Sequence, residues 1–281
     1  MTEPQQAGPA RPGAARACPV CRGPGSGDGR YPRCYGCEVH RRVAGALLAD
    51  AVVPVAYAVK GGPLARDLWR YKHDDDRAAA GRLARLLDGF LREHGPCVQW
   101  AAGAPGPGWD RVAVVPSGSG RPGRHPLGAI VASCLTLPEV RLVTPSVAGA
   151  LARGRSVSAT WPRVDGPLAG EHVLVIDDTW VSGSSAQSSA VALKQAGAGR
   201  VAVVVLGRHL DPGNRRAAAI VAALASGARR PGHDCAPRPH SHSLPIFRLP
   251  GIMRIYQTSG VIARSAYLRM RGANTLVCNV M

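Results

Sequence analysis

The sequence has little of several residue types. Its 281 residues include two phenylalanines and six tyrosines, and only three of its 35 basic residues are lysines. Residues 1–17 lack the apolar core of a secretory signal, so no export signal is expected. The most apolar stretch, 46–59, is too short for a membrane helix and contains an acid and a proline. These absences predict a cytoplasmic protein without membrane insertion.

The net charge is strongly positive. Thirty-five basic residues against 18 acidic ones give a formal charge of +17. Such a charge favours polyanionic partners, so nucleic-acid binding is one candidate function. An arginine-rich chain with abundant alanine, glycine and proline is also typical of a G+C-rich coding sequence. No single basic run stands out, and the scarcity of aromatic side chains argues against base stacking as a main mode of binding.

Two C-x-x-C pairs, Cys18–Cys21 and Cys34–Cys37, are separated by 12 residues rich in glycine and proline. Each pair can place two thiolates on one tight turn, and four sulfurs can hold tetrahedral zinc. Disulfides are an alternative that a reducing compartment disfavours, and a redox C-x-x-C motif would not occur twice. We predict structural zinc, because four sulfurs leave no open position for a substrate. The remaining cysteines are interpreted as ordinary thiols: Cys97, Cys134, Cys235 and Cys278.

The most informative stretch begins with four apolar residues, Val173–Ile176, which lead into two adjacent aspartates. A loop of small hydroxyl residues around Gly183 follows, then an expected helix over 186–196 and a second buried strand over 201–206. Strand, helix and strand form a βαβ unit. Because such crossovers are right-handed, the two strands are expected to be parallel.

The loop of this unit has the chemistry of a sugar-phosphate site. Gly183 lets the backbone approach a ligand, and the start of the helix offers unsatisfied N–H groups to an anion. Serine hydroxyls can donate to phosphate oxygens, while Asp177 and Asp178 can accept from ribose hydroxyls at the carboxyl end of a strand. An acidic pair can also be a helix cap or a solvated turn. The residues alone leave these alternatives open.

A second loop of small residues follows a predicted strand over 111–116. It is a further candidate anion site at a strand end, with Arg121 and Arg124 able to contact a diphosphate. By itself the loop is equally compatible with a flexible turn. Together the two loops would suit a ribose with phosphate groups at both ends. The residues of the second loop are Ser117, Gly118, Ser119, Gly120 and Arg121.

The rest of the chain gives weaker patterns. The acidic run 74–76 is interpreted as a solvated turn and helix cap rather than a cation site, and Pro54 places its strand at a sheet edge. Strands are expected over 51–59 and 140–143. One helix is expected from Pro63 to Tyr71 and, after an interruption over 72–76, a second that ends by Gly95. Further helices are expected over 39–49, 125–137 and 215–225. Residues 96–109 are expected to form a Pro/Gly-rich loop.

The acidic pair with its loop is similar to the ribose-phosphate signature of type I phosphoribosyltransferases, which bind 5-phosphoribosyl-1-pyrophosphate (PRPP). It differs at Thr179-Trp180, where that family usually has two aliphatic residues. Over residues 18–210 the chain resembles the ComF family of competence-associated phosphoribosyltransferase-like proteins. The resemblance rests on the four cysteines, the Leu68–Lys72 basic-aromatic stretch, Val115-Pro116 and the acidic pair. Most relatives carry an Arg-Gly-Phe-Asn-like segment where this chain has Arg-Pro-Gly-Arg-His-Pro.

The resemblance implies an α/β fold, a parallel sheet flanked by helices of the type I phosphoribosyltransferase kind, with a small N-terminal zinc ribbon. The parts would be a disordered tail (1–17), the zinc module (18–45), the main domain (46–210) and an extension (211–281). The second loop would face pyrophosphate, and Mg²⁺ would accompany PRPP. The implied PRPP-binding residues are Asp177, Asp178, Thr179, Val181, Ser182, Gly183, Ser184 and Ser185.

Two functions of different class follow. The first is a PRPP-dependent transferase, for which the sequence identifies neither a catalytic base nor an acceptor. The second is a non-catalytic component of DNA uptake, which would bind single-stranded DNA and uptake proteins through the zinc module and the arginines.

Overall fold

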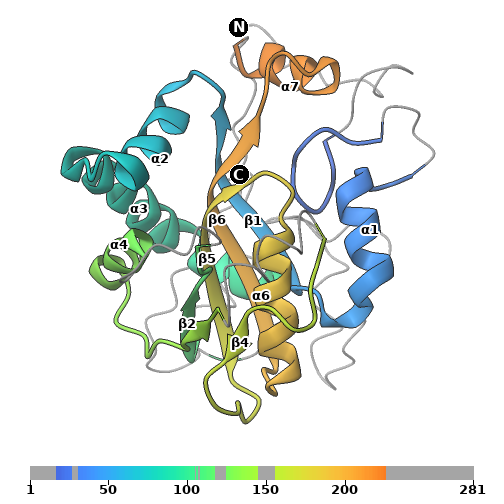
Figure 1. The fold of residues 1–281 in the computed structure, drawn as a ribbon, viewed down its shortest axis with the longest axis vertical. Helices are drawn as coiled ribbons and strands as arrows, with labels where there is room; N and C mark the ends of the chain where they lie inside the picture. Colours follow the sequence, from blue (N-terminus) through green and yellow to red (C-terminus); the bar gives the residue numbers. More distant parts are fainter. Residues whose placement is uncertain are drawn as a thin grey trace, which may run out of the picture. The chain divides into compact units, whose positions relative to one another are not determined.

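A four-stranded parallel sheet forms the centre of the fold (Figure 1), with strand order β1-β6-β5-β2. The computed structural model describes residues 17–26, 31–104, 106, 108–117, 125–144 and 156–225. The strands are β1 (Ala51–Val59), β2 (Arg111–Val114), β5 (His172–Trp180) and β6 (Arg200–Leu210). Helices lie on both sides of this sheet, so the predicted fold class is confirmed.

The βαβ unit predicted around the acidic pair is present. β5 leads through a short loop into α6 (Ser184–Gln195), and β6 then pairs parallel with β5. Val173 to Ile176 are at most 1% exposed, as expected for a strand covered on both faces. Pro54 lies in β1, which pairs with β6 and forms an edge of the sheet in the described part of the chain, as the proline predicted.

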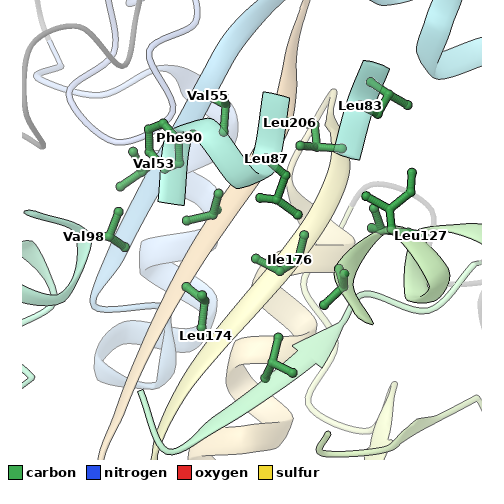
Figure 2. Packing of buried hydrophobic residues seen from close by; sticks show 14 of the residues in the cluster. Val53, Val55, Leu83, Leu87, Phe90, Val98, Leu127, Leu174, Ile176 and Leu206 are labelled. Carbon is green, nitrogen blue, oxygen red and sulfur yellow. The ribbon is translucent and has the colours of Figure 1, made fainter. Parts of the chain in front are cut away.

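Three helices cover one face of the sheet: α2 (Pro63–His73), α3 (Arg77–Ala101) and α4 (Pro126–Cys134). Leu174 and Ile176 of β5 point to this face, where they pack with Leu83, Leu87 and Phe90 of α3 (Figure 2). Asp76 caps α3 by accepting from two backbone N–H groups. The acidic run is thus the predicted turn and cap.

The opposite face is covered by α6, by α1 (Tyr35–Ala44) with its 3₁₀ extension (Gly45–Leu47), and by the cysteine module. Val173 and Val175 point to this side, since neighbouring residues of a strand face opposite ways. Three of the four predicted metal-ligating cysteines belong to the same buried cluster. The module therefore forms part of the core on this face.

Several element boundaries differ from the prediction. α3 continues past Gly95 and Pro96 to Ala101, because Val98 and Ala102 carry the apolar face of the helix into the core. A proline removes only one N–H from such a helix, and this packing outweighs that loss. β2 and α4 are shorter than expected. Residues 140–143 contribute β3 (Leu142–Val143), which pairs antiparallel with the unpredicted β4 (Arg163–Val164).

The remaining predictions concern the ends of the chain. The helix expected over 215–225 is α7 (Arg215–Ala225). Among the described residues, no helix is long and apolar enough to cross a membrane. The described residues belong to a unit spanning Met1–Pro237, and a second unit, Arg238–Met281, falls outside them. The tail 1–16 and most of the C-terminal extension also lie outside the described residues, so the proposed division of the chain stays a prediction.

Candidate functional site

Asp178 is held by two side chains of α2. It follows Leu174 and Ile176 in the alternation of β5 and so faces this helix. The Tyr71 hydroxyl donates to one carboxylate oxygen, and Lys72 Nζ donates to the other at 2.6 Å. Burial, together with the charge of Asp178, raises the pKa of Tyr71 well above its usual range. Tyr71 therefore stays a neutral donor and fixes the carboxylate.

Asp177 lies in a different environment from its neighbour. Its Oδ1 accepts a hydrogen bond from the backbone N–H of Asp178 at 2.9 Å, and its side chain is buried. Burial and the adjacent charge of Asp178 raise the pKa of Asp177 from 3.8 to about 7. Asp177 is therefore largely protonated below pH 7, because a buried carboxylate beside another carboxylate resists ionisation.

The loop between β5 and α6 depends on Gly183. This residue has φ +80° and is the N-cap of α6. A Cβ atom there would lie 2.0 Å from a ring carbon of Trp180, which is itself only 1% exposed. Glycine is therefore required both by the left-handed backbone and by the close approach of the indole. Trp180, which sets this chain apart from the phosphoribosyltransferase signature, packs on the cysteine side of the sheet and does not line the cavity.

The serines of the loop interact with one another. Ser182 Oγ accepts from the backbone N–H of Ser184 at 3.3 Å, and the two hydroxyl oxygens are 3.1 Å apart. Ser184 is 4% exposed. These contacts hold the first turn of α6 in place, with its N-terminus next to the acidic pair.

A cavity of about 770 Å³ lies in front of the acidic pair. Of the PRPP-binding residues implied by the sequence, it is lined by Asp177, Asp178, Thr179, Val181 and Ser185. Ser182, Gly183 and Ser184 do not line it. Ser117 of the second loop also lines the cavity, so the structure brings the ends of β2 and β5 together. Gly118, Ser119, Gly120 and Arg121 lie outside the described residues.

The remaining walls of the cavity are rich in groups that carry or can carry positive charge. The basic residues that line it are Lys60, Arg66, Arg70, Lys72, His73, His125 and His209. Trp69 also lines it, 56% exposed and stacked on His73 with ring centroids 5.0 Å apart. Two carboxylates surrounded by such groups suit a ligand that combines hydroxyls with several negative charges.

The four predicted metal-ligating cysteines converge. Their sulfur atoms all lie within 4.8 Å of one another, and Cys21 and Cys34 are 3.7 Å apart at sulfur. Tetrahedral zinc with Zn–S bonds of about 2.3 Å requires sulfur pairs about 3.8 Å apart. The six cysteines of the described ranges are all free thiols. The four are thus positioned to bind one metal ion, and their geometry is compatible with a structural zinc site.

Each cysteine pair is shaped by local backbone structure. In the first turn, Arg22 N donates to Cys18 O at 2.9 Å, and Arg22 has φ +56°. In the second, Cys34 is the N-cap of α1 and its sulfur accepts from Cys37 N at 3.5 Å. In the second pair, Cys34 therefore precedes the helix and Cys37 lies in its first turn. α1 begins earlier than the sequence pattern predicted.

Three residues near the loop were not assigned a role by sequence reasoning. Tyr71 and Lys72 fall in the basic-aromatic stretch, but nothing in their spacing relative to Asp178 indicates contact. Arg208 follows a run of apolar residues in β6, where a buried charge is unusual. That single break in the apolar pattern is the only sequence signal that could have drawn attention to it.

Two solved structures among the matches are similar to this chain at low identity. No protein-family model and no curated protein matches the chain. A purine phosphoribosyltransferase from Pyrococcus horikoshii is 15% identical to this chain, with a TM-score of 0.28. The matched region spans 48% of this chain and 89% of that protein. A phosphoribosylpyrophosphate synthetase from Mycobacterium smegmatis is 21% identical to this chain, with a TM-score of 0.29. The matched region spans 55% of this chain and 38% of that protein. Scores this low carry no argument, so the fold description rests on the sheet and its helices.

Proposed function

We propose that this chain is a PRPP-binding protein with a type I phosphoribosyltransferase-like fold. The observation that carries the proposal is the Asp177–Asp178 pair near the end of a central parallel strand, directly before the N-terminus of α6. Carboxylates accept hydrogen bonds from vicinal ribose hydroxyls. The helix N-terminus attracts the 5′-phosphate through its backbone N–H groups and its dipole. Cavities at this edge of an open parallel sheet are the usual ligand sites of α/β proteins.

The basic walls of the cavity account for the diphosphate end of the ligand. Lys72 already contacts Asp178 at 2.6 Å, and we propose that it turns toward the diphosphate when ribose hydroxyls take its place. Mg²⁺, when bound with PRPP, would neutralise part of the diphosphate charge. Asp177 and Asp178 are the carboxylates that line the cavity in the described part of the chain and would face that ion.

The reaction that suits this site is phosphoribosyl transfer. A nitrogen of the acceptor forms a bond to C1′ of the ribose while the bond from C1′ to the pyrophosphate oxygen breaks. Pyrophosphate leaves with the electron pair, and the acceptor nitrogen gives its proton to solvent. The chain contributes orientation of the ribose and stabilisation of the leaving charge, which are the main sources of catalysis for such a step.

We further propose that the chain is a protein of the ComF type that serves DNA uptake from the cytoplasm. Support comes from the sequence resemblance together with the position of its basic-aromatic stretch, since Tyr71 and Lys72 of that stretch both contact Asp178. The four-cysteine centre is proposed to bind structural zinc, because its sulfur spacing matches a tetrahedral site.

The test is calorimetric titration of the full-length, zinc-loaded protein with PRPP and Mg²⁺. We expect binding by the wild type and a loss of at least about tenfold in affinity in Asp178→Asn, which keeps the shape of the side chain but removes its charge. The matched control is Asp88→Asn, since Asp88 lies on the outside of α3 and pairs with Arg92. Equal affinity of the wild type and Asp178→Asn would refute the site.

Absence of PRPP binding in the wild type would refute the proposed function and favour the single-stranded DNA alternative. That alternative has its own test. The affinity for a short oligonucleotide must fall steeply with salt, because phosphate contacts release counterions.

A further inference from the structure

The cysteine module and the β5–α6 loop meet at one buried arginine. Arg208 lies in β6 beside Trp180 of β5 and Tyr57 of β1. Its guanidinium is packed against Gly23, directly after the first cysteine pair. A Cβ atom on Gly23 would lie 2.0 Å from Arg208 Nη2. The side chain therefore spans the distance from the strand ends to the first metal-binding turn.

The other side of the same guanidinium binds the loop. Arg208 Nη1 donates to the carbonyl oxygens of Trp180 at 2.9 Å, Val181 at 3.4 Å and His209 at 2.7 Å. Trp180 and Val181 are the residues at which β5 turns toward α6. Arg208 is only 7% exposed, and its Nε has no hydrogen-bond partner among the described residues. One charged group thus fixes the path of the loop backbone and keeps one donor unused.

Two further contacts join the module to the same region. Gly36, within the second cysteine pair, lies close to the loop, since a Cβ atom there would be 3.9 Å from Ser182 O. The Tyr57 hydroxyl donates to Arg22 O at 2.8 Å and so ties the first turn to β1. Both cysteine pairs therefore lie behind the loop, on the side away from the cavity.

Charge explains why a buried arginine is tolerated here. A guanidinium removed from water is costly unless an opposite charge lies near. Four thiolates around one divalent cation carry more negative charge than the cation neutralises, and the Arg208 guanidinium packs against Gly23, two residues after Cys21. Groups next to a metal's ligands commonly tune the site and are held by it in turn.

We propose that Arg208 is a positioning residue that couples the four-cysteine centre to the β5–α6 loop. In this arrangement the metal-loaded module holds Arg208, and Arg208 holds the carbonyl groups of Trp180 and Val181, so that the loop keeps its form. Loss of the metal releases the guanidinium and loosens the loop, although no cysteine lines the cavity. The coupling to ligand binding rests on the proposed function, whereas the coupling to the loop backbone does not.

The test is hydrogen–deuterium exchange of the full-length protein, zinc-loaded and after treatment with a chelator. We expect zinc removal to speed exchange at residues 180–185 by about tenfold or more, the size of a typical coupling between sites. Amides of α3 that exchange by local opening, on the other face of the sheet, should keep their rates. Acceleration of α3 to the same degree, or no acceleration of the loop, would overturn the proposal.

Arg208→Met keeps an unbranched apolar stem, shorter than that of arginine, and removes the charge and the donors of the side chain. With zinc bound, the loop of this variant should already exchange at the fast rate, so that zinc removal adds little. Its equilibrium affinity for zinc should fall by roughly tenfold to a hundredfold. Arg208→Lys should lie between the variant and the wild type, because it restores the charge but not the planar fork. A merely structural role would not produce this order.

Two more variants keep the test decisive. Gly23→Ala leaves every cysteine and every loop residue intact but displaces the Arg208 guanidinium, so it should reproduce the fast loop exchange of Arg208→Met. Arg200→Met is the matched control, since Arg200 lies at the other end of β6 and pairs with Asp50 at 3.1 Å; it should behave as the wild type. Slow loop exchange in both Arg208→Met and Gly23→Ala would refute the role of Arg208.

The same proteins separate this proposal from the proposed function. If zinc-loaded wild type does not bind PRPP but its loop loosens on zinc removal, the coupling stands and the PRPP site fails. If PRPP binds equally well to the zinc-loaded and zinc-free protein, the coupling to ligand binding fails and the PRPP site stands.

Discussion

The two faces of the central sheet are stabilised in different ways. The face toward α2, α3 and α4 is an ordinary apolar core, in which Leu83, Leu87 and Phe90 pack on β5 and β6. The face toward α6 is covered by a helix of small residues, mainly alanine and serine, and by the cysteine module. Where large apolar side chains are scarce, four sulfurs and one tryptophan fill the space. The second face should therefore depend on its metal, and the first should not.

The largest expected effect comes from breaking the metal centre. Cys37→Ser should abolish zinc binding. Because the free energy of metal binding at such a site also stabilises the fold, the free energy of unfolding should fall by more than the roughly 2–5 kcal/mol that a buried Leu→Ala cavity costs. The matched variant is Leu87→Ala on the other face, where Leu87 is fully buried. Denaturant unfolding and metal analysis provide the measurements.

Leu87→Ala should lose about 2–5 kcal/mol but keep its zinc in full. If it lost zinc as readily as Cys37→Ser, or if Cys37→Ser were as stable as the wild type, the distinction between the faces would be wrong.

Gly183→Ala should have the next largest effect. A methyl group at φ +80° is strained, and it would meet the Trp180 ring 2.0 Å away, so we expect a loss of about 2–4 kcal/mol. Phosphate or PRPP binding should weaken as well, because the N-terminus of α6 shifts. Calorimetry with the ligand, beside thermal unfolding, checks both effects. A stable variant with unchanged binding would show that the indole can move aside, and that the loop is less constrained than its packing indicates.

The sequence predicted most of this loop but not what stands behind it. Val173–Asp178 and Gly183 carry local signals, because a buried strand, an acidic pair and a glycine at a helix start each follow from short-range patterns. The contacts of Tyr71 and Lys72 with Asp178 join residues more than one hundred positions apart. Such pairings depend on the tertiary fold, which no local period encodes.

The same distinction holds for the fold as a whole. The strand order could not be derived from the four strand signals, since β6 inserts between β1 and β5 only through tertiary packing. Pro96 predicted the end of a helix, but α3 continues past it, because Val98 and Ala102 extend the buried face of the helix. The cysteine spacing predicted the convergence of four sulfurs but not their contact with the loop through Arg208. Local rules thus indicated both candidate sites, and only the structure connects them.

Asp177 should make the stability of the protein depend on pH. Burial beside Asp178 raises the pKa of Asp177 from 3.8 to about 7, so between these values the folded protein binds more protons than the unfolded chain. The stability of the wild type should therefore decrease as pH rises from about 4 to about 7. Asp177→Asn removes this dependence and should be more stable than the wild type at pH 8 by on the order of 1–3 kcal/mol, with little difference near pH 4.

Unfolding at a series of pH values measures this effect. Asp88→Asn on the exposed side of α3 serves as the control and should follow the wild-type profile. Parallel profiles for Asp177→Asn and the wild type would mean that folding does not raise the pKa of Asp177.

The smallest expected effect concerns Gly89 of α3, a helix that covers the apolar face of the sheet. It sharpens the contrast with Gly183. Gly89 lies within α3, and a Cβ atom there would have no neighbour within 4 Å beyond its own helix backbone. Gly89→Ala should therefore stabilise the protein by about 0.5–1 kcal/mol, because alanine loses less backbone entropy in a helix. Thermal unfolding of both alanine variants measures the pair. Opposite signs would confirm that glycine is tolerated in α3 and required in the loop, whereas destabilisation by both would mean that α3 packs more tightly around Gly89 than its open surroundings indicate.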